Sequence, residues 1–245
     1  MRRSVPILLV VGVALAASGC ESTQDQAARV QKANALRTKI AAQPLRIPRS
    51  DSRIRVTSKV LLKGKDVNAV VVTLKNTSSK SIADIPIAVN VRNRSGRLVA
   101  TNTAPGSDHW LNHVPLIRAG QTVDWIDDQF DPDTTAASAS VKVGIGAVVN
   151  RPYADARLFR TSFFEDPVSG TSLAGKAKSS APVTQERLVV FSVGRSGGRV
   201  VSAGRGVVER LAGGKASGFT VFFVGANPKS VALKTIAPPV LSPKK

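Results

Sequence analysis

The chain has 245 residues, with 35 Lys and Arg against 16 Asp and Glu, so its formal net charge at pH 7 is +19. Apolar residues make up 42% of it, which suits one or two folded domains and excludes a wholly disordered chain. With one Cys and two His in the chain, a disulfide framework, a thiolate zinc site and a Cys-rich redox centre are excluded.

The first twenty residues combine a basic start, a short apolar run and the only cysteine. Arg2 and Arg3 precede an apolar run from Val5 to Ala17, a pattern typical of a secretory signal peptide. The run is shorter than the about 20 apolar residues that a spanning helix needs. It ends in Ala17-Ser18-Gly19-Cys20, which resembles a bacterial lipobox. The resemblance implies removal of residues 1–19 and acylation of Cys20 with diacylglycerol and fatty acids such as palmitate; the alternative is a free Cys behind an ordinary signal.

A lipid on Cys20 would hold the mature protein on the extracytoplasmic side of a bacterial membrane. Each buried methylene of an acyl chain contributes about 0.8 kcal/mol, so two or three chains anchor far more firmly than one. Because the anchor uses the only Cys, the exported part has no disulfide and depends on packing and strand pairing. Loss of two basic residues with the signal lowers the net charge to +17.

A basic tether, residues 20–50, follows the signal peptide. Its weakly amphipathic pattern from Ala27 to Ile40 favours a helix that ends before Pro44. From Arg29 to Lys65 there are eleven basic residues and one acid, Asp51. Near an anionic bilayer each basic residue contributes about 1 kcal/mol. The tether therefore either lies along lipid headgroups or is a solvated linker, and the sequence leaves both open.

Beyond Asp51 apolar and polar residues alternate with period two, as in half-buried strands. Turn signals such as Ser95-Gly96 and Ala119-Gly120 separate the runs. No helix-length amphipathic stretch interrupts them, so the predicted fold class is all-β and antiparallel, with sandwiches in place of a parallel sheet. Pro86 predicts an edge strand or a bulge, because proline cannot donate to a ladder. The clearest alternating runs are Ile85–Val91 and Val141–Ile145.

The chain resembles itself at a shift of 102 residues. The shift places Val89-Asn90-Val91 on Phe191-Ser192-Val193, and Ser95–Val99 on Gly197–Val201. Internal repetition predicts two tandem β-sandwiches. Their expected bounds are 51–150 and 153–238, with a C-terminal tail at 239–245; the alternative is one large irregular β domain.

These strands and turns resemble the FxLYD domain. The features that carry the resemblance are the alternating strand, the Gly turn followed by a basic residue, and the Ala-Gly turn before an aromatic strand. The namesake strand aligns with Val89–Asn93 and Phe191–Arg195, where only Phe191 matches and neither repeat keeps the Tyr-Asp pair. The resemblance implies an immunoglobulin-like β-sandwich of exported prokaryotic proteins, many of them lipoproteins, and supplies no catalytic residues.

The loop around the two histidines is the first candidate site. On a helix, the spacing of His109 and His113 would put both imidazoles on one face, with Asp108 as a third metal ligand. Prolines on both sides predict a loop, where that spacing need not bring the rings together. The favoured interpretation is that Trp110 caps the sandwich end beside partly exposed histidines, so neither a metal nor another cofactor is expected.

An acidic cluster is the second candidate site. Calcium loops are rich in oxygen ligands, but the required ligand order and Gly turn are missing here. Glycosidase carboxylates face each other across a cleft, which nothing in the sequence predicts. The favoured interpretation is a solvated strand end and loop that pairs with basic residues of the tether or the second sandwich. The cluster comprises Asp124, Asp127, Asp128, Asp131 and Asp133.

Motifs for catalysis are scarce. The Gly194–Gly198 segment is interpreted as a hairpin turn between strands, and not as a nucleophile elbow. Both histidines lie in one loop, which leaves few members for a Ser-His-Asp triad. No enzyme is therefore expected.

The charge is unevenly distributed: residues 66–170 carry a net −1 and residues 171–245 a net +10. Nucleic-acid binding would also need stacking aromatic residues, and an exported protein rarely meets nucleic acid. Expected partners are the membrane through Cys20, and anionic lipid headgroups, acidic envelope polymers or envelope proteins.

The sequence therefore predicts a lipid-anchored cell-envelope protein that acts as a non-catalytic binding or interaction module. Two alternatives stay open. One is a metal-binding protein or hydrolase that uses the His109/His113 loop and the Asp124–Asp133 cluster. The other is a structural subunit of an envelope or secretion assembly.

Overall fold

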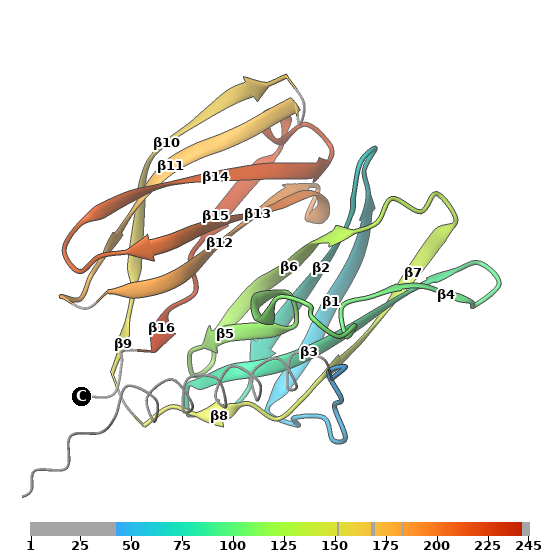
Figure 1. The fold of residues 1–245 in the computed structure, drawn as a ribbon, viewed down its shortest axis with the longest axis horizontal. Coiled ribbons are helices and arrows are strands. Elements are labelled where there is room, and N and C mark those ends of the chain that lie inside the picture. The colour runs from blue at the N-terminus through green and yellow to red at the C-terminus, as the bar shows by residue number, and fades with distance from the viewer. Residues whose placement is uncertain (1–42, 151, 168–169, 183, 242–245) are drawn as a thin grey trace, which may run out of the picture. The chain divides into compact units, whose positions relative to one another are not determined.

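The computed structural model describes residues 43–150, 152–167, 170–182 and 184–241. This part of the chain consists of antiparallel strands with two short 3₁₀ turns, and it contains no α-helix (Figure 1). The predicted all-β antiparallel class is confirmed. The predicted signal peptide, Cys20 and the tether up to residue 42 lie outside the described residues. No helix in the described ranges is both long enough and apolar enough to cross a bilayer.

Strands β1 to β8 form two sheets. In the first sheet, β2 (Asn68–Asn76) pairs with β1 (Ile54–Lys63) and β6 (Thr122–Phe130). In the second, β3 (Ile82–Asn93) is the central strand. Its partners are β4 (Leu98–Thr101), β5 (His113–Ile117), β7 (Ala136–Val143) and β8 (Ala147–Val148).

Pro86 is predicted to mark an edge strand or a bulge, and the prediction of an edge strand is wrong. Strand β3 has neighbours on both sides, because Ile82 pairs with Ile117 of β5 and with Val148 of β8. The carbonyl of Pro86 accepts a hydrogen bond from the Gly144 amide at 2.7 Å, in the link between β7 and β8. A residue in an antiparallel strand directs its N–H and C=O to the same neighbour. The missing N–H of proline therefore faces a break in the ladder.

That break also ends the predicted alternation of Val141, Val143 and Ile145. Strand β7 stops at Val143, and Ile145 is 55% exposed. Gly146 turns inward in its place, where a Cβ would lie only 2.6 Å from Ile82 Cγ2. The close approach of β8 to β3 requires glycine at this position.

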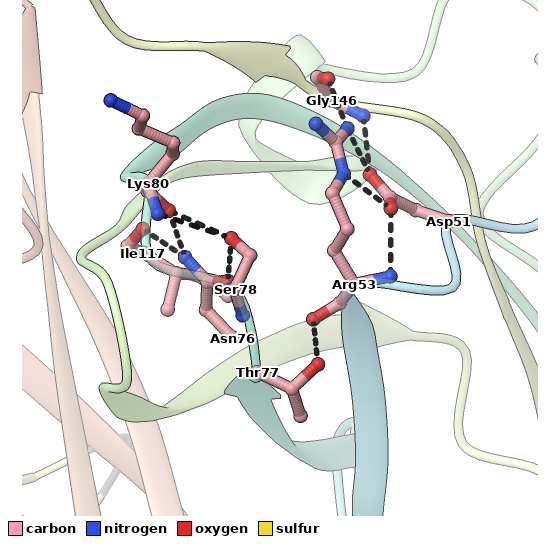
Figure 2. A network of polar contacts seen from close by, with 8 residues as sticks. All are labelled: Asp51, Arg53, Asn76, Thr77, Ser78, Lys80, Ile117 and Gly146. Carbon is pink, nitrogen blue, oxygen red and sulfur yellow. Dashed lines mark hydrogen bonds and ion pairs between the residues drawn. The ribbon is translucent and has the colours of Figure 1, made fainter.

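Residues that precede β1 hold the segment between β7 and β8 in place. The Asp51 carboxylate accepts from the Gly146 amide at 3.2 Å, and Arg53 Nη2 donates to Asp51 Oδ2 at 2.6 Å and to the Gly146 carbonyl at 2.9 Å (Figure 2). The Arg53 hydrogen bond holds the pKa of Asp51 below its usual range. The one acid in the basic stretch from Arg29 to Lys65 is thus a buried structural group.

Strands β9 to β16 form a second set. Six of them make one antiparallel sheet in the order β10–β11–β14–β13–β12–β15. The short β9 (Tyr153–Ala154) pairs with β16 (Val240–Leu241), which lies within the predicted C-terminal tail. The sheet strands are β10 (Ala156–Asp166), β11 (Gly170–Ser179), β12 (Gln185–Ser196), β13 (Arg199–Leu211), β14 (Ala216–Gly225) and β15 (Ala232–Ile236). The two 3₁₀ turns are η1 (His109–Leu111) and η2 (Pro228–Ser230).

The 102-residue repeat corresponds to similar hairpins in different sheets. Strands β3 and β12 each have twelve residues and end in a glycine turn, at Gly96 and at Gly197-Gly198, where φ is positive. Strands β12, β13 and β14 then lie in one sheet, whereas β3 and β4 lie apart from β6. Two segments of similar pattern are therefore paired differently.

Strand β12 is buried on both faces. Leu188 and Val190 pack in a cluster within the six-stranded sheet, whereas Val189, Phe191 and Val193 belong to the core that includes β1, β2, β3 and β6. The described residues all belong to one compact unit. Strands on the two sides of the predicted boundary at 150–153 pair in separate sheets, but their side chains share one hydrophobic core. The number of domains stays a prediction.

We expect Phe191→Ala to lower the free energy of unfolding by about 3–5 kcal/mol, because it leaves a cavity in a well-packed core. Phe191 is 1% exposed, whereas Phe222 of the same sheet is 46% exposed. The matched change Phe222→Ala should cost about 1 kcal/mol or less. Urea unfolding followed by far-ultraviolet circular dichroism measures both, and equal losses would contradict the shared core.

Candidate functional site

The histidine loop is held by a buried amide. The Asn102 side chain accepts from the Val89 amide at 2.7 Å and donates to the carbonyls of Ile87 at 3.1 Å and Leu111 at 2.7 Å. Asn102 is buried, so all these bonds are shielded from water. The amide therefore fixes the loop between β4 and β5 against the central strand β3.

The 3₁₀ turn η1 brings the two histidines together. Asp108 caps the turn, since its Oδ1 accepts from the Trp110 amide at 3.0 Å. The rings of His109 and His113 stack with centroids 4.0 Å apart and an interplanar angle of 17°. Trp110 meets His109 edge-on at 4.9 Å. The His-x₃-His spacing thus places both imidazoles on one face although the segment is no α-helix.

A third group, Asp84 of β3, joins the histidines. Asp84 Oδ1 lies 2.8 Å from His109 Nε2, and this hydrogen bond lowers the pKa of Asp84. One ligand atom each from Asp84, His109 and His113 lies within 4.8 Å of the other two. Asp84 adopts a left-handed backbone with φ of 51°, a conformation that Asp tolerates better than most residues. The sequence offered one signal, a lone carboxylate inside the apolar run Ile82–Ile87.

His113 is held as a neutral imidazole. Its Nδ1 lies 2.6 Å from Asn112 Oδ1, and an amide oxygen only accepts, so Nδ1 carries the proton. Burial, together with the neighbouring His109, lowers the pKa of His113 to about 4. At neutral pH the other ring nitrogen, Nε2, therefore carries a lone pair.

Asp108, the acidic residue that the sequence placed with the histidines, is directed elsewhere. Besides capping η1, its carboxylate accepts a hydrogen bond from Arg187 Nη2 of β12. The group of possible metal ligands in the described ranges contains Asp84 in its place. The cluster thus differs from the set predicted by sequence spacing in one acid, Asp84 in place of Asp108.

The acidic cluster divides into a buried and an exposed part. Asp124, Asp127 and Asp128 lie in β6 and are largely buried, so the prediction of a solvated strand end is wrong for them. Asp131 and Asp133 follow the strand, and Asp133 accepts from the Thr135 amide at 2.7 Å in a turn. In the described part of the chain, no three groups of this cluster come within metal-binding distance.

Two of the buried acids pair with arginines of the six-stranded sheet. Both oxygens of Asp124 lie 2.8 Å from Arg195 Nη2, and Thr73 Oγ1 donates to Asp124 Oδ1 at 2.7 Å. Asp128 Oδ2 accepts from the Arg205 amide at 2.9 Å, and Arg205 Nε lies 3.4 Å from Asp128 Oδ1. These acids therefore connect β6 to β12 and β13.

Asp127 forms no ion pair with an arginine among the described residues. It is 2% exposed, and its carboxylate accepts one hydrogen bond, from the Gln129 amide at 3.1 Å. Burial raises the pKa of Asp127 to about 7. Asp127 borders a cavity of about 310 Å³ that Asn102 and Asp108 also line. A buried carboxyl that titrates near neutral pH destabilises the fold when it ionises.

Strands β10 and β11 carry a basic face. Arg157 pairs directly opposite Lys178, and Lys176 lies on the same face because side chains in a strand alternate. All three side chains are exposed, and none forms an ion pair with another described residue. Like charges opposite each other destabilise a sheet. We call Arg157, Lys176 and Lys178 the basic face.

Aromatic residues continue this face towards β14. The register aligns Phe164, Ser172 and Phe222 in one row, which ends at Arg205 of β13. Phe164 and Phe222 are both exposed. Phe222 and Arg205 also line a cavity of about 770 Å³ beside the β1–β2 turn at 64–67. The face thus combines cations with apolar rings.

No protein-family model matches the chain, and no curated protein matches it. The FxLYD resemblance stays a prediction that rests on the sequence.

We expect Asp127→Asn to stabilise the protein increasingly as the pH rises from 4 to 7, and to leave stability almost unchanged below pH 4. The folded-state pKa of Asp127 is raised from 3.8 to about 7. The stability that the fold has with Asp127 protonated is therefore fully present below pH 4 and is lost as the pH rises through 7. The variant should gain up to about 4 kcal/mol over the wild type between pH 4 and pH 8. Unfolding at both pH values tests this, with Asp131→Asn as the exposed control. An equal gain in the control would contradict the assignment.

Proposed function

We propose that this chain is a lipid-anchored envelope protein whose β-structured part is a non-catalytic module that binds anionic components of the envelope. The lipobox-like Ala17–Cys20 segment supports the anchor. The observation that carries the binding proposal is the basic face, where Arg157, Lys176 and Lys178 gather without acidic partners in the described part of the chain.

The charge of the second strand set divides into two classes. Arg187, Arg195 and Arg205 are used internally, because they pair with Asp108, Asp124 and Asp128. The lysines of β11 are free of such pairs in the described residues. Since like charges destabilise a sheet unless something offsets them, the basic face is suited to a partner that supplies negative charge.

Anionic lipid headgroups are the partner that we favour. Each Lys or Arg near an anionic leaflet contributes about 1 kcal/mol. Contacts from the basic face and from exposed Phe164 and Phe222 would be weak alone, but anchoring through Cys20 supplies a high effective concentration. Acidic envelope polymers offer the same charge, and the experiments below distinguish them from lipid.

We expect Cys20→Ser to release the protein from the membrane fraction of a bacterial expression host, because the acyl chains dominate attachment. Fractionation in 0.5 M salt followed by immunoblotting measures this. The wild type should remain with membranes, and its mass should show the lipid. A Cys20→Ser form that still sediments at high salt would contradict lipid anchoring.

We expect unlipidated protein, carrying Cys20→Ser, to sediment with phosphatidylglycerol vesicles at low salt and to be released as salt shortens the Debye length to about 10 Å at 0.1 M. Adding Lys176→Gln and Lys178→Gln should reduce binding about tenfold or more. Lys80→Gln with Lys142→Gln removes the same charge from exposed positions of the first strand set and is the matched control.

Three results would overturn the lipid assignment. They are an equal loss in both double variants, equal binding to phosphatidylcholine vesicles, and retention on an acidic polysaccharide resin without vesicle binding. The last result would identify an acidic envelope polymer as the partner of the basic face.

A further inference from the structure

We propose that Asp84, His109 and His113 bind a divalent transition-metal ion, of which Zn²⁺ is the best match. The site goes beyond the envelope-binding function and uses none of its residues. Its basis is the approach of three ligand atoms of metal-binding type, within 4.8 Å of one another, from two separate segments of the fold.

The separations suit a small adjustment to coordination. Zinc binds imidazole nitrogen and carboxylate oxygen at about 2.0–2.2 Å in tetrahedral geometry, so its ligand atoms lie about 3.4 Å apart. Asp84 Oδ1 and His109 Nε2 are already 2.8 Å apart, where a metal would replace the shared proton. One ligand atom of His113 lies within 4.8 Å of both other ligand atoms, so a modest side-chain rotation would bring it into the same sphere.

The surroundings of His113 prepare it as a ligand. Asn112 Oδ1 accepts from Nδ1 and so leaves Nε2 unprotonated, which is the usual role of an outer-shell partner at a metal site. A surface ion pair would be a sufficient reason for His109 and Asp84 to lie together. It gives no reason for a second imidazole stacked 4.0 Å away.

The ligand set selects the class of ion. Calcium and magnesium prefer sites made of oxygen atoms, whereas two imidazoles and one carboxylate favour zinc, copper or nickel. Asp84 and His109 are exposed and His113 is partly buried, so solvent or a further ligand can complete the coordination sphere.

The position of the site gives metal binding a structural effect. Asp84 belongs to the central strand β3, and His109 lies in η1 at the end of the loop between β4 and β5. A bound ion would cross-link the loop to the strand alongside Asn102. Binding to the folded state alone raises stability in proportion to the logarithm of free metal concentration.

The test uses the full mature chain with Cys20→Ser, free of any polyhistidine tag and stripped of metal by a chelator. We expect calorimetric titration with ZnCl₂ at pH 7.5 to give one ion per chain and a higher melting temperature. Co²⁺ should give visible absorption bands of a site with nitrogen ligands. The variants His109→Ala, His113→Ala and Asp84→Asn should each weaken zinc binding at least tenfold.

Asp108→Asn is the matched control. Asn keeps the cap of η1 while removing the carboxylate that the sequence pattern had favoured as a ligand, so zinc binding should persist. Circular dichroism of each variant verifies its fold. Copper electron paramagnetic resonance gives a second readout, since the wild type should show two nitrogen ligands and His113→Ala one.

The proposal is overturned if no stoichiometric zinc binds, if the histidine variants bind as the wild type does, or if Asp108→Asn alone abolishes binding. The vesicle experiments are done without metal. Failure of the zinc site and failure of the envelope-binding function are therefore separate outcomes.

Discussion

The rest of the structure depends on the burial of β12 from both sides. Successive side chains point to opposite faces of a strand, so Val190 enters the core of the six-stranded sheet and Phe191 the core shared with the first strand set. Apolar burial is worth about 25 cal/mol per Å². Asp124 with Arg195 and Asp128 with Arg205 flank this contact. Buried ion pairs add little net stability, and we infer that these two fix how the strand sets meet.

This packing also explains which charges are available for function. The face of the six-stranded sheet that packs through Phe191 of β12 continues to Phe222 of β14 and to Lys178 of β11, where it is exposed. Arg195 and Arg205 pair with Asp124 and Asp128 of β6, while the lysines of β11 form no ion pair with another described residue. The net +10 of residues 171–245 therefore overstates the free positive charge. The basic composition is thus divided between exposed cations on the sheets and internal ion pairs.

The candidate metal site depends on a different constraint, the buried Asn102 amide. Its three hydrogen bonds join the loop to β3, and β3 also carries Asp84. The ring of Pro86 is accommodated in the same strand because its neighbour strand is interrupted at Gly144. The central strand thus supplies both the acid of the cluster and the anchor of the loop that carries His109 and His113.

The sequence by itself determined what depends on near neighbours: the period-two strands, the glycine turns at Gly96 and Gly197, and the lipobox-like motif at Cys20. It also singled out His109 and His113, which are separated by three residues. Only the tertiary structure decided that Asp84 and not Asp108 joins them, because that choice depends on how β3 and β5 align. Strand pairing and packing bring together residues that are distant in the chain, and local pattern carries no information on such distances.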